Sequence, residues 1–120
     1  MNKFENDIYP IVLWITTDKN DKDIKTLKDL DSDDEVNLDD NEDGLTQSVT
    51  NGIYYNGVLI YLDKNKSRIE LTSIIVHECI HALDMFCNML GMSFDYDNDE
   101  HAAYLAGWIG KCCEECLEKS

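Results

Sequence analysis

Two histidines and a glutamate on one short stretch are the residues whose types and spacing could do chemistry. They stand as His77-Glu78-Cys79-Ile80-His81. Because residues four apart lie on one face of an α-helix, both imidazoles can reach a single ion. Glu78 projects roughly 100° round the helix from His77, where it can hold a metal-bound water instead of the metal. Zinc lowers the pKa of such a water towards about 7, so a neighbouring carboxylate can take its proton. The pattern predicts a Zn²⁺ site with Glu78 as general base.

A catalytic zinc needs a third protein ligand and one open position. Glu100 is the residue that we favour, and eighteen residues separate it from His81. Its neighbours His101 and Asp99 stay open as alternatives. Tyr104 shares a helix face with Glu100. It is expected either to donate a hydrogen bond to a tetrahedral oxyanion or to pack against Glu100 and orient it.

The two segments together resemble the gluzincins, thermolysin-like metallopeptidases in which HExxH on one helix is completed by a Glu on the next. They resemble more closely the small metallopeptidases of phages and mobile elements, which pair an HE-C-xH-A helix with a Glu-x-x-Ala-Tyr-Leu segment. Here that second segment is EHAAYLAGW at 100–108. The similarity covers roughly residues 52–110. It implies an α+β, minimal zincin-like fold, in which the HExxH helix packs on a small antiparallel sheet and a second helix carries the third ligand.

The resemblance also implies a mode of substrate binding and leaves one partner unidentified. In larger relatives an edge strand above the active-site helix binds an extended peptide by β-addition, and residues 57–62 are expected to do so here. Tyr104 stands where the thermolysin group has an Asp four residues after the ligand Glu. The group that orients His77 or His81 is therefore open. The acidic candidates are Asp84, Asp97 and Asp99.

Two helices are expected to position these residues. Ser67 and Glu70 have the spacing of a capping box, and Gly91 is placed to end the helix that carries HExxH. A second helix should run from about Asp99 to Leu117. One face of the first helix is apolar and lies opposite the two histidines on the helical wheel. This pattern predicts that the apolar face is buried. Its residues are Ile75, Cys79, Ala82, Leu83, Phe86 and Leu90.

Three runs rich in β-branched and aromatic residues are expected to form strands, at 8–17, 46–55 and 57–62. Pro10 cannot donate to a ladder, so it should lie at the start of its strand or on a sheet edge. Asn56-Gly57 is the strongest hairpin signal, and Asn51-Gly52 is a competing turn that leaves the register open.

The segment 18–44 is rich in acids and is expected to be a surface insertion within a single domain spanning 1–120. Ile24, Leu27 and Leu30 have helical spacing, which predicts a short surface helix around 22–30. The remainder is expected to be an acidic loop, whose role the sequence does not identify.

Charge and composition narrow the classes of partner. The net charge of −15 argues against nucleic acid, whose binding proteins need a basic footprint, and fits a peptide or protein substrate. No apolar run approaches the roughly 20 residues that span a bilayer, and the first residues lack the apolar stretch of a secretory signal. We therefore expect no membrane partner, a cytoplasmic location and reduced thiols. The sequence predicts no oligomeric state.

A second hypothesis competes with the peptidase. The chain could be a non-catalytic acidic zinc-containing binding protein or a DNA-mimic decoy, whose acidic side chains fill the DNA site of a DNA-binding enzyme.

The C-terminal cysteines form a separate motif, in which Cys113 and Cys116 make a CxxC pair. A second metal site would need two such clusters, and redox chemistry would need a βαβ context. These cysteines are therefore expected to be ordinary small apolar residues or exposed thiols.

Overall fold

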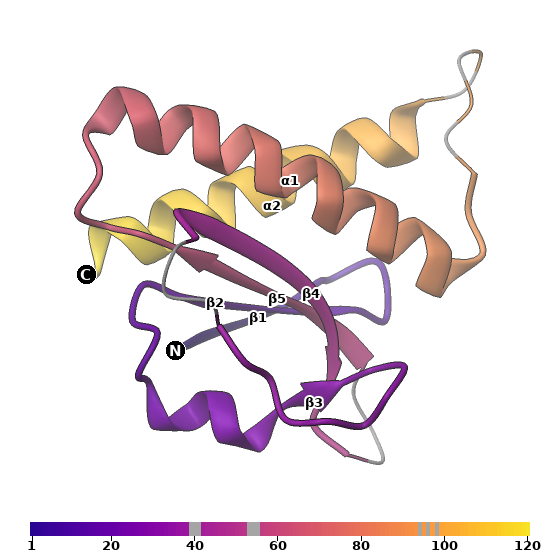
Figure 1. Cartoon of the computed structure of the whole chain (residues 1–120). Helices are drawn as coiled ribbons and strands as arrows, with labels where there is room; N and C mark the ends of the chain where they lie inside the picture. The colour runs from indigo at the N-terminus through magenta and orange to yellow at the C-terminus, as the bar shows by residue number, and fades with distance from the viewer. Residues whose placement is uncertain (39–41, 53–55, 94, 96, 98) are drawn as a thin grey trace.

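A computed structural model describes residues 1–38, 42–52, 56–93, 95, 97 and 99–120 (Figure 1). Within them two long helices lie across one mixed sheet of five strands in the order β1-β2-β5-β4-β3. The strands are β1 (Asn2–Glu5), β2 (Val12–Thr16), β3 (Lys28–Asp29), β4 (Gly44–Thr50) and β5 (Asn56–Leu62). The helices are the 3-10 helix η1 (Lys22–Thr26), α1 (Arg68–Leu90) and α2 (Glu100–Glu118). The fold is α+β.

The sheet is mixed, which corrects the expectation of an antiparallel one. β2 and β5 run parallel, whereas β1–β2, β4–β5 and β3–β4 are antiparallel. The β4–β5 hairpin turns the chain back beside β2 in the direction of β2 itself. A run of β-branched residues does not encode strand direction, so this arrangement could not be inferred from composition.

Both faces of the sheet centre are covered (Figure 1). Towards the helices, β2 contributes Leu13 and Ile15, and β5 contributes alternate residues such as Ile60, to the larger apolar cluster. Towards η1, Trp14 and Leu59 belong to a second, smaller cluster. All five residues of β2 are buried as a result, since the strand has no solvated face.

The N-terminal strands differ from expectation in extent. β2 begins at Val12, so Pro10 precedes the strand, as its missing N–H requires. The sequence does not predict β1, whose four residues NKFE alternate half-buried and exposed as the strand pairs antiparallel with β2.

The acidic segment is only partly a surface feature. A 3-10 helix ends at Thr26, shorter than the helix expected over 22–30, and Lys28–Asp29 then pairs with β4. Ile24 is 6% exposed and Leu27 is 1% exposed. Leu27 joins the cluster beneath the sheet. The segment therefore supplies part of the second core layer as well as charge.

The prediction of a turn at Asn56-Gly57 is wrong, because both residues lie in β5. The β4–β5 ladder extends to the pair Thr50–Asn56, so the chain reverses within 51–55, of which 53–55 lie outside the described residues. Gly52 in the competing turn has a φ of 115°. Gly57 serves another purpose, since a Cβ there would overlap the carbonyl oxygen of Val12 and come within 2.9 Å of the Trp14 ring.

Replacing Gly57 by Ala is expected to lower the free energy of unfolding by about 3 kcal/mol, because the added methyl forces β2 and β5 apart. Gly110→Ala in α2 is the matched control. No atom lies within 4 Å of a Cβ at that position, and alanine should stabilise the helix by about 0.5–1 kcal/mol. Urea denaturation of both variants measures the difference. Equal stabilities would contradict the close approach of β2 and β5.

The two helices confirm the sequence-based expectation closely. Ser67 accepts a hydrogen bond from the Glu70 amide at 3.2 Å, and Gly91 ends α1 in the left-handed region with φ 67°. Asp99 precedes α2 as its N-cap. On the predicted apolar face of α1, five of the six residues are buried, and Leu90 at its end is half-buried. None of the described helices combines the length and apolar character needed to cross a membrane.

Candidate metal centre

His77 and His81 lie together on the solvent-exposed face of α1. Their Nε2 atoms are 3.2 Å apart, and their rings meet edge to face with centroids separated by 4.8 Å. One N–H···N hydrogen bond accounts for this distance. The helix therefore brings both ring nitrogens together in front of α1.

The separation of the two nitrogens fits a zinc ion. Two ligands at a Zn–N distance of 2.0–2.1 Å and a tetrahedral angle lie about 3.3–3.4 Å apart. The 3.2 Å between Nε2 of His77 and Nε2 of His81 is within about 0.2 Å of that value. The separation of the two nitrogens is therefore the one that two ligands of a single ion need.

Glu78 turns from the histidines towards the sheet and is 6% exposed. Its Oε2 accepts a hydrogen bond of 2.5 Å from the Thr46 hydroxyl on β4, and its backbone oxygen lies 3.3 Å from the same hydroxyl. Its Cγ would lie 3.1 Å from a Cβ at Gly44. The carboxylate is thus held between α1 and β4.

The first turn of α2 does not join the histidines. Glu100 is exposed, and His101 Nδ1 is hydrogen-bonded to the Tyr9 hydroxyl at 2.8 Å. Tyr104 is 40% exposed, and its hydroxyl accepts from the Asn6 amide at 3.3 Å. Within the described ranges, no three His, Cys, Asp or Glu side chains are grouped closely enough to hold a metal ion.

The described residues also include no carboxylate that would orient the imidazole rings of His77 and His81 by a hydrogen bond. The three acidic candidates are all exposed, namely Asp84, Asp97 and Asp99. The link between α1 and α2 includes 94, 96 and 98, which lie outside the described residues.

The strand beside the candidate site is β4, which corrects the expectation for residues 57–62. β5 lies in the middle of the sheet, so its backbone groups are already paired on both sides. β4 contacts Glu78 through Thr46, and β3 pairs with it only at Val49 and Thr50. Among the described residues, the outer edge of β4 over 44–47 has no strand partner.

Apolar surface flanks the histidines along α1. Ile69 is 86% exposed, and Val76 and Ile80 are each 59% exposed. A shallow hollow includes Ile69, Val76 and His77 in its lining, and a second one continues from Ile80 towards Met92. Exposed aliphatic side chains in one row on a helix are typical of a surface that meets another molecule.

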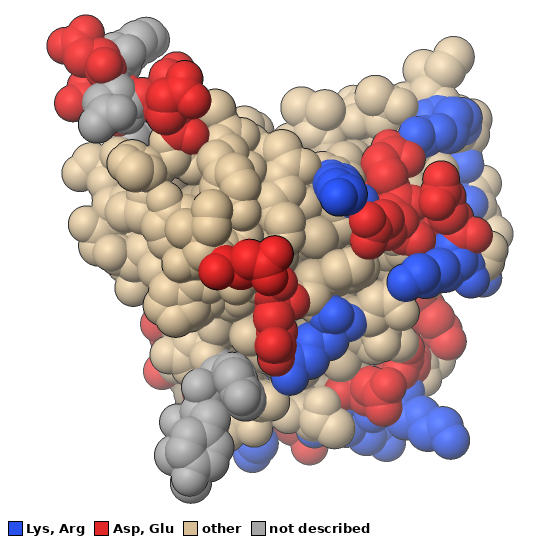
Figure 2. Space-filling model, turned by 180° about the vertical axis from the view of Figure 1, so that it is seen from behind, with Lys and Arg blue, Asp and Glu red and all other residues tan. Residues whose placement is uncertain are grey.

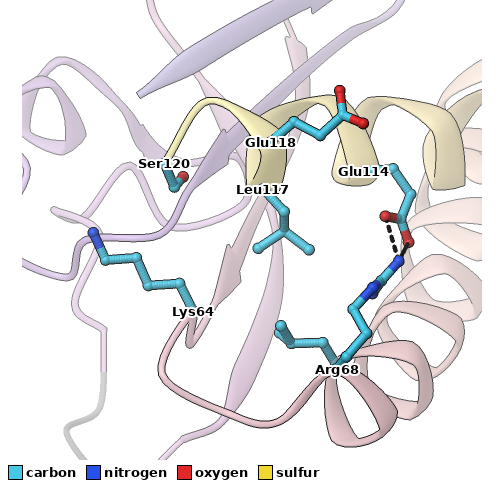
Figure 3. Close-up of a pocket in the computed structure, with 7 residues that line it drawn as sticks. Lys64, Arg68, Glu114, Leu117, Glu118 and Ser120 are labelled. Atoms are coloured by element: carbon cyan, nitrogen blue, oxygen red, sulfur yellow. Dashed lines mark hydrogen bonds and ion pairs between the residues drawn. The ribbon is translucent and has the colours of Figure 1, made fainter.

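An ion pair joins the two helices away from the histidines. At the far ends of the two helices, Arg68 donates to both carboxylate oxygens of Glu114 at 2.7 and 2.6 Å (Figure 3). That hydrogen-bonded carboxylate raises the pKa of Arg68. The hollow around the pair contains no histidine or cysteine. Seen from behind, acidic side chains form separate groups with lysines or arginines beside several of them (Figure 2).

The five cysteines are all buried free thiols. Burial raises the pKa of Cys112 to about 12. A hydrogen bond with Cys79, together with burial, raises the pKa of Cys113. Cys112, Cys113 and Cys116 belong to the main apolar cluster, as expected of small apolar residues.

Sequence reasoning missed Thr46 and Gly44, which hold Glu78 from the sheet side. Thr46 is 32 positions away from Glu78 in the chain, and no local pattern links a strand threonine to a helix glutamate.

Comparison with known proteins identifies no relative of this chain. No family model matches the chain, and neither a curated protein nor a solved structure shows significant similarity to it.

Proposed function

We propose that this chain is a zinc-dependent peptidase that uses His77 and His81 as metal ligands and Glu78 as general base. One observation carries the proposal: the Nε2 atoms of the two histidines converge to 3.2 Å on the exposed face of α1. Zinc in that position would supply a Lewis acid for the scissile carbonyl and lower the pKa of a bound water.

Glu78 has the chemistry that such a site needs. Glu78 directly follows His77 in the chain, and its carboxylate lies on the β4 side of α1. Thr46 donates to Oε2, which leaves Oε1 as the oxygen to take a proton from the attacking water. The same carboxyl group would then return that proton to the leaving amine.

Glu100 is the proposed third ligand, and His101 and Asp99 are the alternatives. The support is the interval from His81 and the resemblance of the second segment to that of small metallopeptidases. His101 stays an alternative, because the Tyr9 hydroxyl engages its Nδ1 at 2.8 Å and leaves Nε2 for an ion. Tyr104 would stabilise the oxyanion or orient Glu100.

A polypeptide is the proposed substrate. The outer edge of β4, beside Glu78, offers backbone groups to an extended chain. The exposed aliphatic residues of α1, Ile69, Val76 and Ile80, offer apolar contacts next to the histidines. Nucleic acid is a poor partner for a chain of net charge −15.

The alternative is a non-catalytic acidic binding protein or DNA mimic that carries zinc for structure. Two observations favour it, the net charge of −15 and the Glu78 carboxylate tied to Thr46 as in a purely structural contact. On the face drawn in Figure 2 the acidic side chains form separate groups, several with cations beside them, so that face does not offer the continuous acidic surface that a mimic of DNA needs.

Hydrolysis of an unfolded protein such as reduced, alkylated casein tests the proposal. The zinc-loaded protein should cleave it, chelator should abolish cleavage, and added zinc should restore it, because the metal activates the water. New amino termini, measured by a fluorogenic amine reagent, report the reaction. A zinc-loaded, folded protein that produces no new termini would contradict the peptidase.

A further inference from the structure

The contact between β4 and Glu78 is the most specific polar interaction around the candidate site. The Thr46 hydroxyl lies 2.5 Å from Oε2 of Glu78 and 3.3 Å from its backbone oxygen. A hydroxyl has one proton to donate, and the shorter distance assigns it to the carboxylate. Hydrogen bonds to a charged acceptor are the stronger class, so this contact restricts the rotation of the Glu78 side chain.

Gly44 lies on the same face of β4 as Thr46 and also borders the Glu78 carboxylate. A Cβ at Gly44 would lie 2.7 Å from Cγ2 of Ile74, 3.1 Å from Cγ of Glu78 and 3.3 Å from its Oε1. Glycine therefore leaves the space that the side chains of Ile74 and Glu78 fill. The strand offers a hydrogen-bond donor to one carboxylate oxygen and open space beside the other.

We infer that Thr46 is a positioning residue for Glu78, holding Oε2 so that Oε1 keeps one orientation for proton transfer. This inference rests on the proposed function, in which Glu78 is the base. A buried carboxylate without this donor would sample other rotamers, and misplacement by about 1 Å costs on the order of 10²-fold in rate. Because Thr46 belongs to the proposed substrate edge, one strand would fix both the peptide and the base.

Two isosteric variants isolate the hydroxyl. Thr46→Val keeps the shape but removes the donor, and it should lower kcat about 10- to 100-fold with KM changed less than about twofold. Thr46→Ser keeps the donor and should retain kcat within about threefold of the parent. A role in packing alone would predict the reverse, because Ser loses the methyl group that Val retains.

A second measurement needs neither zinc nor activity. In metal-free protein labelled with ¹³C at glutamate carboxyls, the Glu78 signal is identified by its absence from Glu78→Gln. That signal should move in Thr46→Val and stay in place in Thr46→Ser. In the parent protein, the Thr46 hydroxyl proton should exchange with water more slowly than those of exposed threonines, a result that does not depend on any variant folding.

The outcomes separate this inference from the proposed function. An active Glu78→Gln protein would overturn the function itself. An inactive Glu78→Gln protein beside a fully active Thr46→Val protein would leave the function standing and overturn the role of Thr46. An unshifted Glu78 carboxyl signal, or a fast-exchanging Thr46 hydroxyl, would overturn it as well.

Discussion

Replacing Glu78 by Gln is expected to slow peptide hydrolysis by about 10²–10⁴-fold, the usual effect of removing a general base. Gln has nearly the same shape, and its amide oxygen can still accept the Thr46 hydrogen bond, so the contact between α1 and β4 should persist. The variant should retain its zinc, because the two histidines proposed to bind the ion are unchanged. Initial rates on casein, with zinc content measured on the same samples, test both expectations.

The same variant discriminates the peptidase from the acidic decoy. In a DNA mimic, Glu78 is one of 25 acidic residues and lies buried, so its loss should have little effect on the biological activity. Neutralising four acids of the 18–44 segment, at 33, 34, 39 and 40, should then abolish that activity. A functional Glu78→Gln protein beside an inactive acidic-segment variant would show that the peptidase proposal is wrong.

The helices could be predicted from the sequence because their signals are local. The Ser67 cap, the Gly91 terminus and the 3.6-residue period of apolar positions all lie within α1 itself. The period also placed His77 and His81 correctly on the exposed face. Backbone hydrogen bonds between neighbours in sequence determine such an element, so one stretch of chain contains the information.

The sheet was less predictable because its contacts are not local. Gly57 illustrates the difficulty, since Asn-Gly indicates a turn, whereas here glycine allows the close approach of Val12 from a strand 45 positions earlier. Three of the four residues of β1 are polar, and the strand forms by pairing with the edge of β2. Residues 57–62 read as an edge strand, yet pairing on both sides places them at the centre.

In the candidate site, too, the features that depend on local sequence could be predicted and those that depend on the whole fold could not. The histidine pair depends on one helix and could be predicted to the residue. The hydrogen bond between Thr46 and Glu78 depends on which strand packs against that helix, and this is a property of the whole fold. The proposed third ligand depends on how the first turn of α2 approaches α1, and neither the interval nor the period determines that approach.

Replacing His81 by Ala is expected to abolish binding of about one zinc per chain. Losing a direct ligand should weaken binding by more than the roughly 10- to 100-fold that is typical for loss of an outer partner. Zinc at 1,000 times its dissociation constant stabilises a folded protein by about 4 kcal/mol. For a domain of this size, chelator should therefore lower the melting temperature of the parent by on the order of 10 °C. The melting temperature of His81→Ala should not respond to chelator.

Paired variants of the first turn of α2 identify the third ligand by the same measurements. Glu100→Ala should lose zinc and its chelator-sensitive stability, because two imidazoles alone hold zinc weakly. His101→Ala should keep both, since Glu100 is the proposed ligand. If His101→Ala loses zinc and Glu100→Ala retains it, the third ligand is His101 instead of Glu100. Undiminished zinc in His81→Ala would instead place the ion away from α1, and the histidine pair would then be no more than a hydrogen-bonded contact on its exposed face.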